Sequence, residues 1–274
     1  MTEAEQITAA SRSNLALAFV ALPKARRRDI STFYAFCRVV DDIADGSDSR
    51  AEKAHALNRW RAALATETGD EPALAPAVRA LIAEYELPVG HFHEVIAGVE
   101  MDLDVVRYET WEDLRLYCHR VASVVGLVSI VIFGTKTAAA RDYALNLGLA
   151  LQVTNILRDV GQDYANGGRI YLPAEDLRRF EVTEEDIRAG RRTDGFLALM
   201  DFESKRAEQF YTAAQLPAAD RRALTAAEIM RSVYQRLLRK MQADRWLVFD
   251  RRYRLSKPLK LWLVVAGLVR ARLG

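Results

Sequence analysis

Two polar segments of this 274-residue chain have the residue types and spacing of metal- and phosphate-binding sites. The first lies within FYAFCRVVDDIAD (residues 33–45). At helical periodicity four of its side chains fall within about 60° of one another: Tyr34, Arg38, Asp41 and Asp45. Carboxylates one turn apart repel each other, and a cation between them reverses the sign of that interaction. Mg²⁺ is usually held by one or two carboxylates and substrate phosphate. A solvated acidic helix face would give the same pattern, so both interpretations remain open here.

The second segment is ALQVTNILRDVGQDY (residues 150–164). One helical face carries Gln152, Asn155, Asp159 and Asp163, with Arg158 beside it. The preceding residues 144–150 are mostly apolar, so this polar face continues a buried helix, and buried polar groups need partners. Cations would supply those partners, and a structural polar network is the alternative.

Together the two faces predict a site that holds a diphosphate through Mg²⁺, if they meet across a helical bundle. Arg38 and Arg158 are suited to bind phosphate oxygens, because a guanidinium pairs with them in a bidentate way. The four histidines lack zinc-ligand spacing, and the chain has neither a P-loop nor a GxGxxG motif. Beside an apolar cavity, a metal-bound diphosphate suggests ionisation of an allylic C–O bond. Aromatic rings could stabilise the cation; the candidates are Phe33, Tyr34, Phe36 and Tyr117.

The elements that position these residues are predicted to be helical almost throughout. Apolar residues recur at three- and four-residue spacing in the ranges 26–46, 50–66, 72–86, 89–106, 110–133, 137–165, 195–214, 217–242 and 256–272. The part VASVVGLVSIVIF (residues 121–133) is apolar all round and predicts a central buried helix. Small residues at its start, Ala122, Ser123 and Gly126, leave room for a hydrocarbon or permit close helix packing. The loop ANGGRIYLP (residues 165–173) is a candidate lid.

Composition narrows the class of protein further. Half of the residues are hydrophobic, 28% are charged and the net charge is +2, which is typical of a globular protein without a nucleic-acid partner. Cys37 and Cys118 are expected to be buried free thiols in a reducing compartment. The chain has no signal peptide, so we expect a cytoplasmic protein. Its basic C-terminal segment 256–272 is expected to pack on the core; contact with a membrane surface is the alternative.

The sequence resembles the squalene/phytoene synthase family. Four motifs in order carry the resemblance: FYAFCRVVDDIAD (33–45), YCHRVASVVG (117–126), LQVTNILRDVGQD (151–163) and GRIYLP (168–173). The resemblance implies an all-α, single-domain isoprenoid synthase (class I terpenoid synthase) bundle over residues 1–274, with a central cavity. It also implies head-to-head condensation of two allylic prenyl diphosphates through a cyclopropylcarbinyl diphosphate.

The resemblance also assigns roles to individual residues. The implied metal ligands are Asp41, Asp45, Asn155, Asp159 and Asp163. Arg38 and Arg158 match diphosphate-binding residues, and Tyr117 matches a tyrosine near the departing diphosphate. The other implied substrate-binding residues are Tyr34, Gln152, Arg169, Tyr234 and Arg252, with Arg251 as an alternative to Arg252. Arg169 could contact phosphate or, in reducing members, NADPH.

Three positions depart from the family pattern. Gln162 stands where an acid is common, SNLALAF (13–19) replaces a Ser-Phe signature, and Ser123 stands where many members have glycine. With a serine at this position the sequence resembles bacterial enzymes that make presqualene diphosphate from farnesyl diphosphate. We therefore expect condensation of two farnesyl diphosphates via presqualene diphosphate, to squalene, dehydrosqualene or presqualene diphosphate itself.

The alternatives are a phytoene synthase that uses two geranylgeranyl diphosphates, a class I terpene cyclase, and a non-catalytic relative that assists respiratory complex I assembly. The expected cofactor is Mg²⁺, or Mn²⁺ in its place, with NADPH only if the product is squalene. A monomer or weak homodimer is expected.

Overall fold

The computed structural model describes residues 2–10, 18–104 and 106–273. Within them the chain forms helices, loops and one isolated bridge between Arg107 and Ile170, and no strand. The helices are α1 (Glu3–Ala10), α3 (Lys24–Asp45), α4 (Arg50–Ala65), α5 (Ala75–Tyr85), α6 (Val89–Asp104), α7 (Trp111–Cys118), α8 (Val124–Phe133), α9 (Ala138–Ala165), α10 (Ala174–Arg179), α11 (Glu184–Arg188), α12 (Asp194–Ala213), α13 (Thr225–Ala243) and α14 (Lys257–Leu273). Short turns η1 (Phe19–Ala21), η2 (His119–Ser123) and η3 (Ala218–Asp220) lie between them. The predicted single all-α bundle is confirmed; residues 13–17 of the SNLALAF segment lie outside the described residues.

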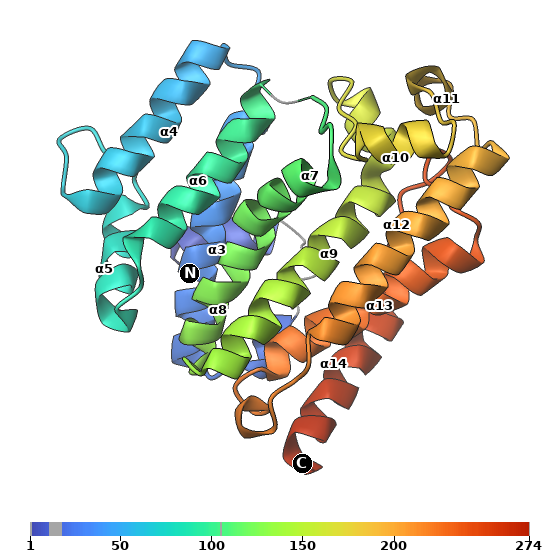
Figure 1. Ribbon diagram of the computed structural model, residues 1–274. Coiled ribbons are helices and arrows are strands. Elements are labelled where there is room, and N and C mark those ends of the chain that lie inside the picture. The colour runs from blue at the N-terminus through green and yellow to red at the C-terminus, as the bar shows by residue number, and fades with distance from the viewer. Residues whose placement is uncertain (1, 11–17, 105, 274) are drawn as a thin grey trace.

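Helix α9 runs through the middle of the bundle, between α8 on one side and α12 and α13 on the other (Figure 1). Its first half is lined with small and apolar residues such as Ala144, Leu147 and Ala150, which are buried in these contacts. The hydrophobic effect therefore fixes the apolar half, and the polar second half, with its carboxylates, extends from that anchored base.

Helices α7 and α8 are continuous through η2, a π-helical turn, so that one helix spans Trp111–Phe133. This helix is long and apolar enough to cross a membrane, and half of its most apolar window is buried inside the structure. Its buried side chains include Val124, Val128 and Ile132. The prediction of a central, buried helix over residues 121–133 is confirmed.

The small residues of this helix serve close packing. A Cβ added at Gly126 would lie 2.9 Å from the carbonyl oxygen of Ala144 in α9. A Cβ added at Gly148 of α9 would lie 2.5 Å from the Cα of Ser123. The Ser123 hydroxyl donates a 2.8 Å hydrogen bond to the Leu145 carbonyl. At these positions the structure favours close helix packing over room for a hydrocarbon.

An aromatic cluster holds α3 against α4 and α6. Phe36 packs on Trp60 and Phe92 with centroids 5.2 Å apart, and Phe33 packs on Phe92 at 5.5 Å. Phe33 and Phe36 are buried. The expectation that they could face a substrate cation is therefore wrong, because they lie on the core side of α3.

Both cysteines are free, as expected; Cys118 is buried and Cys37 partly buried.

Candidate active site

The carboxylates of α3 lie on a partly exposed helix face beside Arg38. Arg38 Nη1 donates to Asp41 Oδ2 over 3.0 Å, and its Nη2 pairs with Asp42. About half of the Asp41 side chain is exposed, but protein surrounds it on the other sides. This partial burial and the charge of Asp45 raise the pKa of Asp41 to about 7. The carboxylates on this face of α3 therefore outnumber the positive charge that Arg38 supplies.

The second face is more deeply enclosed. Arg158 Nε donates to Asp159 Oδ1 over 2.8 Å, and both side chains are less than one fifth exposed. Burial and the neighbouring Asp159 raise the pKa of Asp163 to about 7. Asn155 Nδ2 lies 3.4 Å from Gln152 Oε1. Among the residues that the structure describes, the buried Asn155 Oδ1 has no hydrogen-bond partner, so one strong acceptor is unsatisfied there.

Arg169 and Asp102 join the two faces. Arg169 Nη1 lies 3.6 Å from Asp45 Oδ1, and its Nη2 donates to the Asp102 carbonyl over 2.9 Å. The Arg169 amide also donates to the Asp163 carbonyl over 3.3 Å, at the end of the second face. Arg169 thus contacts residues of both acidic faces, so the loop after α9 brings the end of the second face close to the carboxylates of α3.

The loop after α9 brings Arg169 into place. Gly167 and Gly168 adopt φ values of +123° and +72°, which favour glycine. The Ile170 amide then donates to the Val106 carbonyl over 3.1 Å, which ties the loop to the segment that follows α6. This is the segment proposed as a lid from its composition.

A tyrosine cluster lies against Asp102. The hydroxyls of Tyr171 and Tyr117 donate to its carboxylate over 2.7 Å and 3.0 Å. Tyr171 stacks on Tyr117 with centroids 5.2 Å apart and on Tyr108 at 5.9 Å. Burial, followed by the charge of Asp102, holds the pKa of Tyr117 well above its usual value. Tyr117 is therefore a hydrogen-bond donor at neutral pH, and the buried Tyr108 hydroxyl has no hydrogen-bond partner within the described part of the chain.

Sequence reasoning missed Asp102, Tyr108 and Tyr171. Tyr171 stands inside the GRIYLP motif, and Asp102 follows an apolar stretch of α6, so each left a weak signal.

The remaining sequence-predicted residues differ in how closely they approach this cluster. Tyr234 is buried on α13. Burial raises the pKa of its hydroxyl, and the nearby charge of Arg158 opposes that rise. Tyr34 shares the face of Arg38 and touches the edge of Phe19, with centroids 6.2 Å apart. Arg252 is exposed, and within the described ranges no hydrogen bond or ion pair joins it to the carboxylates. Its alternative, Arg251, pairs with Asp244.

The donor set could hold divalent cations only with help from a ligand. Among the residues that the structure describes, no group of three His, Cys, Asp or Glu side chains surrounds a single point. The carboxylates come in pairs, and Asn155 adds one free oxygen. Phosphate oxygens are the ligands that would complete such coordination.

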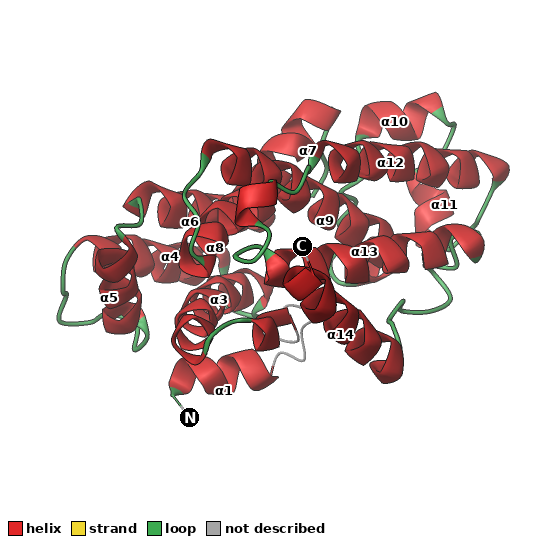
Figure 2. Ribbon diagram, turned by 90° about the horizontal axis from the view of Figure 1, so that it is seen from below, coloured by secondary structure: helices red, strands yellow, loops and turns green. Residues whose placement is uncertain are grey.

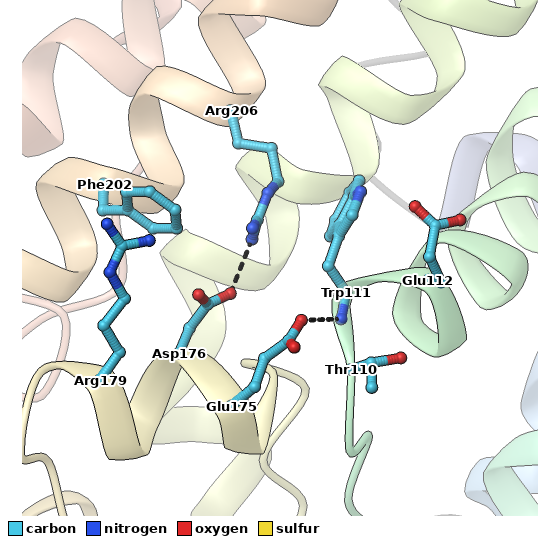
Figure 3. A pocket seen from close by; sticks show the side chains of 8 residues that line it. All are labelled: Thr110, Trp111, Glu112, Glu175, Asp176, Arg179, Phe202 and Arg206. Carbon is cyan, nitrogen blue, oxygen red and sulfur yellow. Dashed lines mark hydrogen bonds and ion pairs between the residues drawn. The ribbon is translucent and has the colours of Figure 1, made fainter.

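A pocket of about 590 Å³ lies elsewhere, among α7, α10 and α12 (Figure 3). Arg206 stacks over the Trp111 ring at 4.3 Å and reaches Asp176 over 3.1 Å. The two basic residues of this pocket, Arg179 and Arg206, thus already contact aromatic rings of the protein. A second pocket of about 280 Å³ lies between α13 and α14. Neither is lined by the carboxylates of the two faces, so the hydrocarbon cavity stays a prediction.

Comparisons with known proteins concern the family and the fold of the chain. The family model described as squalene/phytoene synthase matches residues 8–258. A 15-cis-phytoene synthase of Synechocystis sp. is 34% identical, covering 97% of this chain and 84% of its own. A phytoene synthase of Mycobacterium tuberculosis is 36% identical, covering 98% of this chain and 92% of its own.

Two solved structures share the fold over most of the chain. A dehydrosqualene synthase in complex with ligand superposes with a TM-score of 0.82 at 27% identity, covering 99% of this chain and 96% of its own. A squalene synthase from Alicyclobacillus acidocaldarius gives a TM-score of 0.75 at 29% identity, covering 89% and 93%. The same bundle thus serves enzymes named for different products.

Proposed function

The chain belongs to the squalene/phytoene synthase family and is a prenyltransferase, and we propose that it condenses two geranylgeranyl diphosphates head to head to phytoene. The relatives above that are 34–36% identical to this chain are named phytoene synthases. The expectation of farnesyl diphosphate rested on Ser123, whose hydroxyl is bound to the Leu145 carbonyl of α9. A side chain used in helix packing gives no reason to prefer the shorter substrate.

The contacts that support this chemistry are those of Arg169, which approaches Asp45 of the first face, donates to the Asp102 carbonyl and donates through its amide to the Asp163 carbonyl of the second. A cluster of carboxylates with too little compensating charge is unfavourable by itself and becomes favourable around cations and a polyanion.

We propose that Mg²⁺, or Mn²⁺, is held by Asp41, Asp45, Asn155, Asp159 and Asp163. The unsatisfied Asn155 Oδ1 and the repelling carboxylate pairs fit such ions. When bound, the ions would stabilise negative charge on the leaving diphosphate. Arg38 and Arg158 would bind its oxygens, since their guanidiniums already border the acidic faces.

The tyrosines would act on the hydrocarbon side of the same site. The Tyr117 hydroxyl stays protonated and donates its single proton to Asp102, so it would have to exchange this acceptor for an oxygen of the departing diphosphate when substrate binds. The stacked rings of Tyr108, Tyr117 and Tyr171 offer π faces that stabilise a nearby carbocation. The enclosed position of these rings would keep water from it.

A product assay tests the proposal. With Mg²⁺ and geranylgeranyl diphosphate we expect phytoene and released diphosphate, with or without NADPH. Asp41→Asn and Asp159→Asn should each abolish turnover. Full activity of both variants would contradict the metal assignment.

Condensation of two farnesyl diphosphates is the second candidate, because the two structural neighbours above are named dehydrosqualene and squalene synthase. A C30 product from farnesyl diphosphate, with no turnover of geranylgeranyl diphosphate, would decide for it. NADPH dependence of that product would show that it is squalene. The terpene cyclase and assembly-factor hypotheses have less support, because the family model and the relatives are named for phytoene or squalene synthesis.

A further inference from the structure

Helix α14 presents two apolar faces on opposite sides. One packs on α13: Leu263 and Val264 are buried, and a Cβ added at Gly267 would lie 2.4 Å from Ile229 Cγ1. The other side is exposed and carries Leu261, Trp262, Val265 and Val269. At helical periodicity these four fall within about 100° of one another, roughly opposite the packed face. The sequence-based expectation of a core-packing helix thus describes only one of its two faces.

The exposed face is unusual for this molecule. Seven large hydrophobic side chains are exposed among the described residues, and four of them lie on α14. Leu261 and Trp262 are 61% and 59% exposed. Scattered apolar residues are ordinary on a protein surface, whereas a contiguous stripe marks a site of interaction.

Positive charge surrounds this stripe. Helix α14 contains no acidic residue, and Lys257, Arg270 and Arg272 are exposed near its ends, whereas Lys260 is half-buried on the packed side. The neighbouring groove of about 280 Å³ is lined by Arg236, Arg239 and Lys240 of α13, with Leu255 and Leu259. None of these three basic side chains has an ion-pair partner within the described ranges. An apolar stripe bordered by unpaired basic groups is complementary to an anionic lipid surface.

The position of α14 leaves this face accessible. The helix lies at the edge of the bundle with its C-terminal end projecting beyond the neighbouring helices (Figure 1), and it is an outer element in the view from below (Figure 2). Helix α13, against which it packs, also carries Tyr234 of the candidate site.

We propose that the exposed face of α14 docks this protein on a bilayer containing anionic phospholipids. Trp262, Leu261, Val265 and Val269 enter the headgroup–acyl boundary. The basic residues at the ends of α14 and in the α13 groove contact lipid phosphates. The proposal does not depend on which prenyl diphosphate is the substrate, because it concerns a surface outside the acidic site.

Vesicle flotation of the full chain tests it. We expect binding to vesicles that contain phosphatidylglycerol at low salt, and much weaker binding to pure phosphatidylcholine vesicles or in high salt. The double variant Trp262→Ser/Val265→Ser should lower the partition coefficient by at least about tenfold. The matched control is Leu116→Ser, which removes an exposed leucine of α7 and should bind as the wild type does.

Fluorescence locates the contact. Trp60 and Trp246 are at most 2% exposed, Trp111 is partly buried and Trp262 is the most exposed of the four tryptophans. Brominated lipids should therefore quench chiefly Trp262, and Trp262→Phe should remove most of the quenching while the vesicles still bind.

Three results would overturn the proposal. The first is flotation of the double variant equal to that of the wild type. The second is flotation of the wild type with neutral vesicles in high salt equal to its flotation with anionic vesicles in low salt. The third is a concentration-dependent dimer that the double variant abolishes, together with no binding of the wild type to vesicles. The last would identify the face as a contact between two copies of the chain.

Discussion

Asp102 accepts hydrogen bonds from Tyr117 and Tyr171 while its backbone carbonyl accepts one from Arg169. We expect Asp102→Asn to lower kcat by roughly tenfold to a hundredfold, a loss typical of residues that orient the groups of a metal site. The amide keeps one acceptor oxygen but loses the charge that faces Arg169 and both acidic faces. Turnover of prenyl diphosphate measures the effect.

The matched control for Asp102 is Asp104→Asn on the same helix. Asp104 is exposed and pairs with Arg50 on the surface, so its loss should leave kcat within about twofold of wild type. Equal effects of the two substitutions would show that Asp102 has no special role.

Asn155 gives a second test at this scale, because its buried Oδ1 is unsatisfied. If that oxygen binds Mg²⁺, Asn155→Ala should raise the Mg²⁺ concentration for half-maximal activity by about tenfold to a hundredfold. Asn146→Ala, on the exposed side of the same helix, is the control. A Mg²⁺ titration of both variants measures the shift, and coincident curves would exclude Asn155 as a ligand.

The sequence was informative about residues that repeat along one helix. Spacing alone places Asp41 with Asp45, and Asp159 with Asp163, because helical periodicity is local. Asp102, Tyr108 and Tyr171 could not be selected in this way. Their importance arises from contacts among α6, α7 and the loop after α9, which are distant in sequence.

At the scale of elements, a close backbone contact between two helices is a place to test packing. A Cβ at Gly148 would meet the Cα of Ser123 at 2.5 Å, and backbone cannot move as a flexible side chain does. We expect Gly148→Ala to destabilise the fold by about 1–3 kcal/mol, measured by urea unfolding. In contrast, Gly90→Ala in α6 has open space around the added methyl group and should be neutral or more stable by about 0.5–1 kcal/mol.

Helix ranges were largely predictable, and local irregularities were not. The ranges 110–133 and 137–165 correspond closely to α7–α8 and α9. The π-helical turn at His119–Ser123 leaves no signature in hydrophobic periodicity, because it depends on how α6 and α9 pack on this stretch. Periodicity likewise could not tell whether Ser123 faces a cavity or a neighbouring backbone.

The arrangement of the whole molecule follows from long-range packing. The residue types of the two acidic faces predicted a joint site on the condition that the faces meet, but only the folded chain shows that Arg169 contacts both Asp45 and Asp163. The sequence alone likewise did not predict that α14 has one packed side and one exposed side. An apolar helix with basic ends is compatible with core packing and with a lipid surface, and the bundle leaves one side for each.

The stability of the bundle should depend on pH through a buried ion network. Glu203 of α12 is 1% exposed and pairs with Arg206, which also reaches Asp176 of α10. Burial raises the pKa of Glu203 from 4.5 to about 7, despite the favourable charge of Arg206. Between these pH values the unfolded chain releases a proton that the folded protein retains, so this group lowers the free energy of unfolding as pH rises.

Glu203→Gln removes that titration. We expect the free energies of unfolding of the variant and the wild type to differ least near pH 4.5. As pH rises to 8, the variant should become more stable relative to the wild type by a few kcal/mol, since each unit of pKa shift corresponds to about 1.4 kcal/mol. Thermal and urea unfolding from pH 4.5 to 8 measure the difference. Glu208→Gln, which removes an exposed carboxyl from the same helix, controls for the change in net charge. A difference between Glu203→Gln and wild type that stays constant over this range would mean that Glu203 is ionised in the folded bundle throughout, with Arg206 compensating its burial fully.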